Sequence, residues 1–264
     1  MGTPPPLGFH LVLRLQDDRV FAPSVAGRRR LAQVFMALAR EVPVLAWRVV
    51  DTHVHVLVLA DDNGVDALVA RLRMRMARVH PGVPLLLSRR LPVRNQWHLA
   101  ECFRYVLAQD AHHGVSADPL QEASAVLDIL GLRVGCPPIA LRVREHLPRV
   151  TRAELLEHVG VTTLAPARGT DALAEAACAA FALDTVAGRG AQANAARHAA
   201  MHAAGDAPAR VAAALGVTAR CVQRVVSEHA APPDAAVRAV GLQMALRRAR
   251  ALPVSPFAGE IAEA

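Results

Sequence analysis

The fold prediction for this sequence starts from the stretch VLAWRVVDTHVHVLVLA, residues 44–60. It consists of two apolar runs, 44–50 and 53–60, which only Asp51 and Thr52 separate. Two strand-like runs joined by two residues are typical of a tight antiparallel hairpin. We therefore expect a β-hairpin at the centre of the first half of the chain.

The segments around this hairpin predict a sheet covered by helices. Residues 9–15 alternate as a strand does, and residues 84–93 contain one more strand-like run. Helical periods occupy about 26–41, 64–79 and 95–112. The order strand, helix, strand, strand, helix, strand is typical of a ferredoxin-like βαββαβ sandwich, so we expect an α+β fold.

The texture of the chain changes after residue 115, where strand-like alternation stops and Ala-rich helical periods take over. We expect one domain over residues 1–118 and an all-α domain over residues 119–264. Within the second, residues 207–226 hold a short helix, a Gly turn and a further helix that begins after Thr218. This pattern predicts a helix-turn-helix.

The second helix of that pattern carries Arg220, Gln223 and Arg224, which we expect to contact DNA phosphates or base edges. Residues 170–230 resemble the DNA-binding domain of bacterial replication initiators. The alternative interpretation is two Ala-rich helices that only pack against their neighbours.

The composition excludes several classes of protein. With 53% hydrophobic and 20% charged residues, the 264-residue chain is neither disordered nor collagen-like. Its apolar stretches are too short to cross a bilayer, and residues 1–8 lack the pattern of a secretory signal. Its four cysteines are too widely spaced for a disulfide framework. We expect a cytoplasmic protein with free thiols and no membrane partner.

The charge predicts a partner that carries phosphates. All 30 basic side chains are Arg, against 23 acidic ones, which gives a net charge of +7. A GC-rich genome explains the missing Lys but not the surplus of cations, and cations that neutralise phosphates favour nucleic acid. Because aromatic residues are scarce, base stacking falls on few rings, such as Trp47 and Trp97. The candidate contacts to the DNA backbone are Arg71, Arg75, Arg78, Arg89 and Arg90.

The sharpest local motif is His53-Val54-His55 in the second strand of the hairpin. Side chains alternate along a strand, so both imidazoles point to one face and offer two neighbouring nitrogens to a divalent metal. Two structural histidines are the more common explanation of this motif alone.

A later helix adds the polar groups that strengthen the metal hypothesis. Tyr105, the single Tyr of the chain, and Gln109 are four residues apart and share one face. We hypothesise that Gln109 is an oxygen ligand of the metal and Tyr105 a nucleophile. The alternative is a half-buried core Tyr and a surface Gln. The same polar stripe includes His98, Cys102 and His112, opposite an apolar stripe of Leu99, Phe103 and Val106.

These two motifs together resemble the HUH-type single-tyrosine transposases, in particular the REP-associated tyrosine transposases. The resemblance covers about residues 8–119, including the opening FHLVLR strand and the RRRL start of the first helix. It implies that His53, His55 and Gln109 hold Mg²⁺ or Mn²⁺ and that Tyr105 attacks a DNA phosphate to form a 5′-phosphotyrosine link. It also implies single-stranded or hairpin DNA as the partner and a homodimer with a composite site.

The sequence departs from that family in three places, which marks it as a divergent member. The usual Tyr-Ile-x-x-Asn-Pro-Val-Arg-Ala-Gly is YVLAQDAHHG here, and Asp51-Thr52 stands where the family has Pro-Asn. The aromatic, Lys-rich strand before the last helix is reduced to SRRLPV, residues 88–93. His112 and His113 are the candidates for a base that assists Tyr105.

Two other functions remain open from the sequence. The first is a domesticated, catalytically inactive regulator that binds duplex DNA through the helix-turn-helix. The second is a metal hydrolase that uses the His53-Val54-His55 motif on small substrates, although the chain has no HExxH motif or carboxylate-rich cluster.

Overall fold

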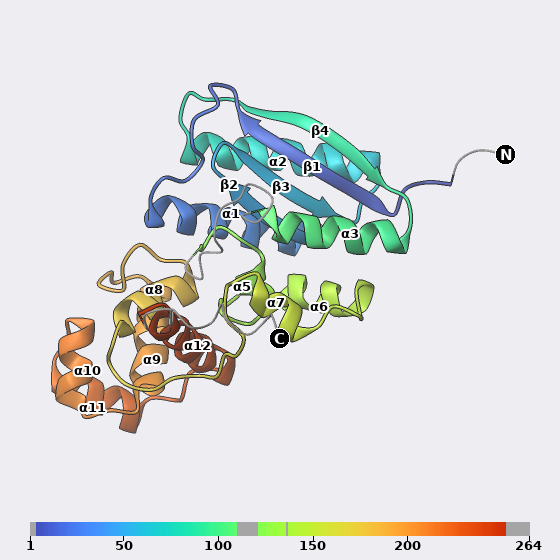
Figure 1. Ribbon diagram of the computed structural model, residues 1–264. Helices are drawn as coiled ribbons and strands as arrows, with labels where there is room; N and C mark the ends of the chain where they lie inside the picture. The colour runs from blue at the N-terminus through green and yellow to red at the C-terminus, as the bar shows by residue number, and fades with distance from the viewer. Residues whose placement is uncertain (1–3, 110–120, 136, 252–264) are drawn as a thin grey trace, which may run out of the picture.

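The computed structural model describes residues 4–109, 121–135 and 137–251, and it has the mixed helix and sheet composition that the sequence predicts. One four-stranded antiparallel sheet with its helices forms one half of the molecule, and a group of helices forms the other (Figure 1). The α+β class is therefore confirmed.

The sheet contains the predicted hairpin. Its strands are β1 (Gly8–Leu15), β2 (Val44–Val50), β3 (His53–Val58) and β4 (Leu85–Val93), in the spatial order β2-β3-β1-β4. The turn between β2 and β3 consists of Asp51, at φ 34°, and Thr52. Asp tolerates a left-handed backbone better than most residues, which suits this tight connection.

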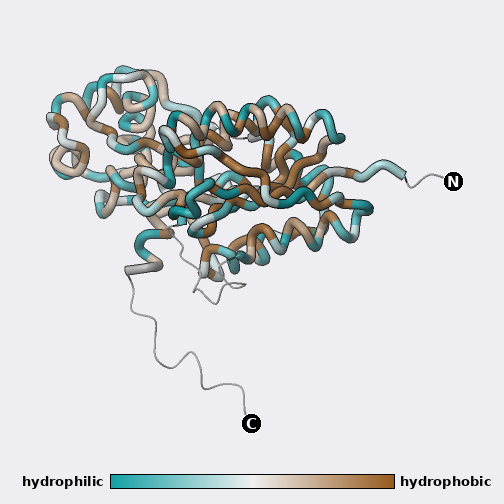
Figure 2. Tube along the Cα trace, turned by 90° about the horizontal axis from the view of Figure 1, so that it is seen from above, coloured by the Kyte–Doolittle hydropathy of each residue, from teal (hydrophilic) through white to brown (hydrophobic). Residues whose placement is uncertain are grey.

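Helices cover both faces of the sheet, as the view from above shows (Figure 2). Helices α1 (Val25–Glu41) and α2 (Asp62–Val79) pack against each other and against β2 and β4, and α3 (Gln96–Leu107) packs against β2, β3 and β4. Each helix begins at an N-cap side chain that accepts a backbone N–H three residues later, a contact that fixes the start of the helix. The three caps are Ser24, Asp61 and Asn95.

The face toward α1 and α2 is the main hydrophobic core. In the β1–β3 register Leu13 pairs with Val54 and Leu11 with Val56, so these side chains share that face. On β2, Trp47 stacks on Phe35 of α1 with ring centroids 4.4 Å apart. Trp47 is 0% exposed, so it cannot stack on a nucleic-acid base, and this part of the sequence prediction is wrong.

The first core continues beyond the sheet and its three helices. The backbone of Ala123 and Ala125 hydrogen-bonds to that of β2, and apolar side chains from there to Val159 join the same core, as do Ala182, Leu242 and Leu246. This region holds α5 (Val126–Ile129), α6 (Pro137–His146) and α7 (Arg152–Glu157). The domain boundary expected near residue 118 lies outside the described residues.

A second core lies among the Ala-rich helices of the second half. They are α8 (Leu173–Phe181), α9 (Ala191–Ala204), α10 (Pro208–Leu215), α11 (Ala219–Glu228) and α12 (Asp234–Ala251). Across the described ranges, no helix combines the length and the apolar character that crossing a membrane requires.

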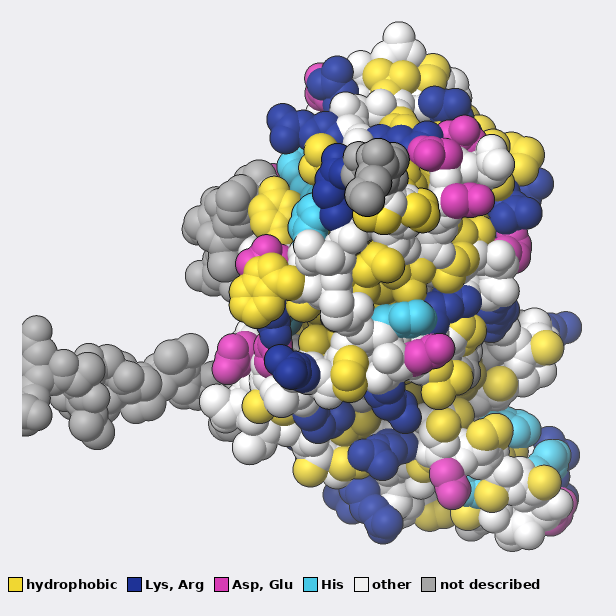
Figure 3. Space-filling view, turned by 90° about the vertical axis from the view of Figure 1, so that its right-hand side faces the viewer, with side chains coloured by type: hydrophobic (Ala, Val, Ile, Leu, Met, Phe, Trp, Pro, Cys, Tyr) yellow, Lys and Arg dark blue, Asp and Glu magenta, His cyan; other side chains and the backbone are white. Residues whose placement is uncertain are grey.

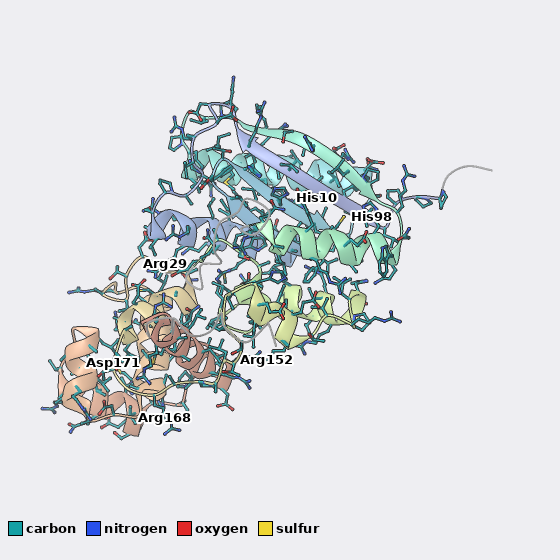
Figure 4. The ribbon with its side chains drawn as sticks, viewed as in Figure 1. His10, Arg29, His98, Arg152, Arg168 and Asp171 are labelled. Atoms are coloured by element: carbon teal, nitrogen blue, oxygen red, sulfur yellow. The ribbon has the colours of Figure 1, made fainter. Side chains whose placement is uncertain are left out.

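A buried ionic cluster joins the two halves. Arg29 of α1 donates to Glu122 at 2.7 and 3.0 Å and also contacts Glu175 of α8. Arg247 of α12 donates to the same Glu122 at 3.2 Å. Figure 4 labels Arg29 at this junction. Each buried charge is stabilised by its partners, because no water replaces a partner that is lost.

Removing the shared carboxylate should destabilise the protein strongly. We expect Glu122→Gln to lower the free energy of unfolding by about 3–5 kcal/mol, because it leaves the buried Arg29 and Arg247 with only the half-exposed Glu175 as counter-charge. Chemical denaturation measures this loss.

The matched control is Asp184→Asn, since Asp184 also bridges the two halves, to Arg30, but in an exposed pair. That change should cost less than about 1 kcal/mol. Equal losses in the two variants would contradict a structural role for the buried cluster.

Candidate functional site

A pocket of about 510 Å³ opens on the sheet face that α3 covers only in part. It contains three histidines and the single tyrosine of the chain. Its lining residues are His10, Val12, Arg14, Asp18, Thr52, His53, His55, Ser88, Arg89, Leu91 and Tyr105.

Strand register brings the histidines together. On β3, His53 pairs with Arg14 of β1 and His55 with Val12, and paired residues share a face. His10 lies two residues before Val12, so its side chain points to the same face. The pairing of β1 with β3 therefore places His10 on the same face as His53 and His55.

His10 and His55 form a buried pair. Nε2 of His10 and Nδ1 of His55 are 2.9 Å apart, the rings are stacked with centroids 5.2 Å apart, and each residue is 4% exposed. Burial, with a smaller contribution from His98 on α3, lowers the pKa of His10 from 6.5 to about 4. His10 is therefore neutral near pH 7. Figure 4 labels His10 and His98 on the strand and helix that face each other.

Tyr105 stands on α3 against this pair. Its ring meets those of His10 and His55 edge-on, with centroids 5.6 and 5.7 Å away. Tyr105 is 39% exposed, while its helix neighbours Leu99 and Phe103 are buried as the sequence predicts. A phenol that borders a pocket and remains accessible can contact a substrate that enters it.

Gln109 lies one turn beyond Tyr105 and is fully buried. Its Nε2 donates to the carbonyl oxygen of Tyr105 at 2.8 Å. Its Oε1 is buried and has no hydrogen-bond partner within the described part of the chain. A buried acceptor of this kind requires an explanation, and a bound cation is one. Gln109 is absent from the residues that line the pocket.

A cation of the pocket lies beside an irregularity in the sheet. Val12 of β1 pairs with Arg89, but Leu13 pairs with Leu87, so Ser88 is the extra residue of a β-bulge in β4. Ser88 donates to the carbonyl of Val12 at 2.9 Å, and both Ser88 and Arg89 line the pocket.

The net charge of the pocket favours an anion. Arg14 contacts Asp18 at 3.5 Å in an exposed pair, which contributes little. Arg89 is exposed and has no carboxylate partner within residues 4–109, 121–135 and 137–251. A guanidinium in this position can bind a phosphate group in a bidentate manner.

The structure places the other predicted arginines of the first half away from this pocket. Arg90 points to the opposite face, where it contacts Asp62 and Asp66 of α2. Arg71 and Arg75 of α2 face Glu41. Arg78 is exposed on the same helix, so none of these four lines the pocket.

Sequence reasoning missed His10 and Arg14 as pocket residues. The signal was present, because both lie at alternate positions of the predicted first strand. Only the pairing of that strand with β3 identifies the face they share with the other histidines. The predicted bases His112 and His113 lie outside the described residues.

The predicted pair of helices in the second half is present as α10 and α11. Gly216 ends α10 with a left-handed backbone at φ 65°, and Thr218 caps α11 by accepting the N–H of Cys221 at 3.2 Å. The predicted DNA-contacting side chains of α11 are all exposed. They are Arg220, Gln223 and Arg224.

A metal at the pocket needs a ligand other than His, Cys, Asp or Glu. Across the part of the chain that the structure describes, no three side chains of those types are arranged to hold an ion. The donors available are the imidazoles of His53 and His55 and the amide oxygen of Gln109. The hydrogen bond to His10 engages Nδ1 of His55, so Nε2 is the nitrogen that can bind a metal.

Comparisons with models of known protein families, with curated proteins and with solved structures find no match to this chain. The geometry of the pocket therefore has to support any functional assignment.

The lowered pKa of His10 predicts how stability depends on pH. Between about pH 6.5 and pH 4 the unfolded chain binds a proton at His10 that the folded chain does not. The free energy of unfolding should therefore fall as the pH falls through this range. Chemical denaturation in the presence of a metal chelator measures it.

His10→Gln is the informative variant, because the amide keeps a donor toward His55 and does not titrate. The variant should lose less stability than the wild type over the same range. Parallel pH profiles of the two proteins would exclude His10 as the titrating group.

Proposed function

We propose that this protein is a metal-dependent nuclease and strand transferase of the HUH single-tyrosine type, acting on single-stranded or hairpin DNA. The observation that carries the proposal is the contact of Tyr105 with the His10–His55 pair, in a pocket that His53 also lines. The sequence motifs are about fifty residues apart, and the folded chain brings them to one place.

The arrangement of the sheet supports this proposal. The order β2-β3-β1-β4, with α1 and α2 packed together, agrees with a ferredoxin-like βαββαβ domain. The helix that carries Tyr105 follows the last strand of that unit and covers the face with the histidines. The proposed nucleophile and two of the proposed metal ligands, His53 and His55, thus come from different elements around one pocket. The third, Gln109, lies one turn beyond Tyr105.

The proposed step is an in-line displacement at phosphorus. The phenolic oxygen of Tyr105 forms a bond to the phosphorus atom of a DNA phosphodiester, and the bond to the 3′-oxygen breaks. The phenol loses its proton to solvent or a nearby base, and the departing 3′-oxygen takes one up to become a hydroxyl. The 5′-phosphotyrosine link conserves a phosphodiester bond, so a 3′-hydroxyl can reverse the step and join strands.

The donor set fits a divalent cation, since amide oxygen suits Mg²⁺ and Mn²⁺ and imidazole binds divalent transition metals. His53, His55 and Gln109 are the residues that would hold it. When bound, such an ion polarises a phosphate oxygen as a Lewis acid. The structural observation in favour of this assignment is the buried Oε1 of Gln109, which has no hydrogen-bond partner among the described residues.

The basic groups at the pocket would hold the DNA backbone. Arg89 and Arg14 line it from adjacent strands, on the face that carries the histidines. Guanidinium groups pair with phosphates through parallel hydrogen bonds, which fixes the strand near Tyr105.

The proposal predicts a covalent DNA–protein adduct. Single-stranded hairpin oligonucleotides incubated with the protein and Mn²⁺ should give a species that resists denaturing electrophoresis. Tyr105→Phe should abolish it, because the ring keeps its packing against the histidines and loses only the nucleophilic oxygen. A chelator should abolish it as well. An equal yield of adduct from Tyr105→Phe would exclude the mechanism.

Two neighbouring arginines of β4 test the orientation of the DNA. Arg89→Gln should slow adduct formation about tenfold or more, because it removes a charge-assisted contact to phosphate. Arg90→Gln is the matched control, because Arg90 points to α2 on the other face, and it should leave the rate within about twofold. A larger loss of rate in Arg90→Gln than in Arg89→Gln would contradict binding of the DNA on the face that carries the histidines.

A second candidate function is duplex DNA binding through α11, which includes the case of an inactive regulator. The observation in its favour is the capped helix pair joined at Gly216, with Arg220, Gln223 and Arg224 exposed on the second helix. A helix that begins at the surface with such side chains suits the major groove.

Salt dependence tests this second function. Arg224→Ala should weaken duplex binding and reduce the slope of log affinity against log salt by about 1, since one phosphate contact is lost. Arg210→Ala is the control, because Arg210 lies on α10 and pairs with Asp206. Fluorescence anisotropy over a range of salt measures both slopes. Identical slopes for the wild type and Arg224→Ala would exclude this contact.

A further inference from the structure

An exposed tryptophan near the start of α3 has no role in the site described above. Trp97 is 72% exposed, more than any other large apolar side chain in the described residues. Exposing an indole costs free energy in water, and a ring that remains accessible offers a face on which a base can stack. The two tryptophans of the chain thus differ completely, since Trp47 lies in the core.

Trp97 forms one wall of a groove of about 500 Å³. Helix α3 supplies this wall, and the segment 147–150 after α6 supplies the other, with the apolar side chains of Leu147 and Pro148. The groove lies outside the histidine pocket and shares none of its lining residues.

Two polar contacts hold the walls of this groove together. Gln96 donates to the carbonyl oxygen of His146, next to Trp97. Arg104, one of the lining residues, donates to Glu154 of α7 at 2.6 Å. Because both walls belong to the first core, the groove is expected to exist before any ligand binds.

The groove and the start of α3 carry exposed cations. Arg149 lines the groove, and Arg94 precedes the N-cap of α3; both are exposed. Neither has a carboxylate partner in the described part of the chain. Figure 3 views the molecule from this end, and many of its dark blue side chains gather over the lower half of the face.

We propose that this groove binds one unpaired base of a single-stranded DNA, stacked on Trp97, with an adjacent phosphate on Arg149. An aromatic face beside cations is the arrangement that binds single strands without sequence preference. An apolar protein segment is the other possible occupant of such a groove. It is disfavoured because it would leave the positive charge of Arg149 without a counter-charge. The inference rests on the proposed function for its choice of DNA.

The position of Trp97 relative to Tyr105 agrees with this role. The two residues are eight positions apart on one helix, which corresponds to about 12 Å along its axis. A strand of a few nucleotides can therefore reach from the proposed cleavage site to the groove. The groove would hold the flank of a hairpin while the pocket holds the phosphate that is cut.

Tryptophan fluorescence tests the inference directly. The protein is Tyr105→Phe in a chelator, so that cleavage cannot occur, and the probe is a short homothymidine oligonucleotide that cannot pair with itself. Binding should quench Trp97 and protect it from acrylamide, and Trp47→Phe should retain the whole signal. Trp97→Ala should weaken binding about 5- to 150-fold, the range expected for one stacked base.

Three further variants complete the experiment. Trp97→Phe keeps a ring and should recover most of the affinity. Arg149→Gln should reduce the salt slope by about 0.7, the value for one phosphate of a single strand. Met74→Ala, which alters another exposed apolar side chain on α2, should bind as the parent does.

Binding without quenching of Trp97, no binding at all, or equal affinity of Trp97→Ala and its parent would overturn the inference. Its failure is distinguishable from that of the proposed function. If binding quenches Trp97, if Trp97→Ala weakens that binding, and if the wild type forms no covalent adduct, the groove is retained and the nuclease is rejected. An adduct formed equally well by Trp97→Ala, with no quenching, would retain the nuclease and reject the groove.

Discussion

The pairing register of β1 with β3 is the constraint on which the candidate site depends. It places His10, His53 and His55 on one face of the sheet, and the hydrogen bond of 2.9 Å between His10 and His55 links the two strands there. Because side chains alternate along a strand, a slip by one residue would turn these histidines into the hydrophobic core and expose Val54 and Val56. The cost of that exchange fixes the register, so the same apolar burial that stabilises the sheet also assembles the pocket.

The two faces of the sheet differ in burial and in charge. One is apolar and covered by α1 and α2, and the charges at its margin are neutralised, as the contacts of Arg90 with Asp62 and Asp66 illustrate. The other carries the histidines, is covered in part by α3, and keeps Arg89 without a carboxylate partner within the described ranges. Positive charge is thus available where a phosphate would have to bind.

Much of the fold could be predicted from local patterns. The hairpin around Asp51, the helix that Thr218 caps and the ends of most elements follow from periodicity and capping. The pairing of β1 with β3 could not, so the sequence does not place His10 beside the other histidines. The sequence also offers Trp47 for base stacking, although that ring is buried. Periodicity identifies which residues share a face of one element, but only tertiary packing decides what that face meets. For the same reason, the neighbouring Arg89 and Arg90 lie on two faces of the sheet, and the first core extends beyond the sheet and its helices to α7 and to part of α12.

The central claim is that Tyr105 attacks a DNA phosphate and retains the strand through its 5′ end. Its most direct test is the transfer of a label from a single-stranded DNA hairpin that carries the label at either its 3′ or its 5′ end. We expect the 3′-labelled strand to become attached to the protein, at the single tyrosine of the chain, and the 5′-labelled fragment to be released with a free 3′-hydroxyl. Attachment of the 5′-labelled fragment, or cleavage without attachment of the 3′-labelled fragment, would contradict it.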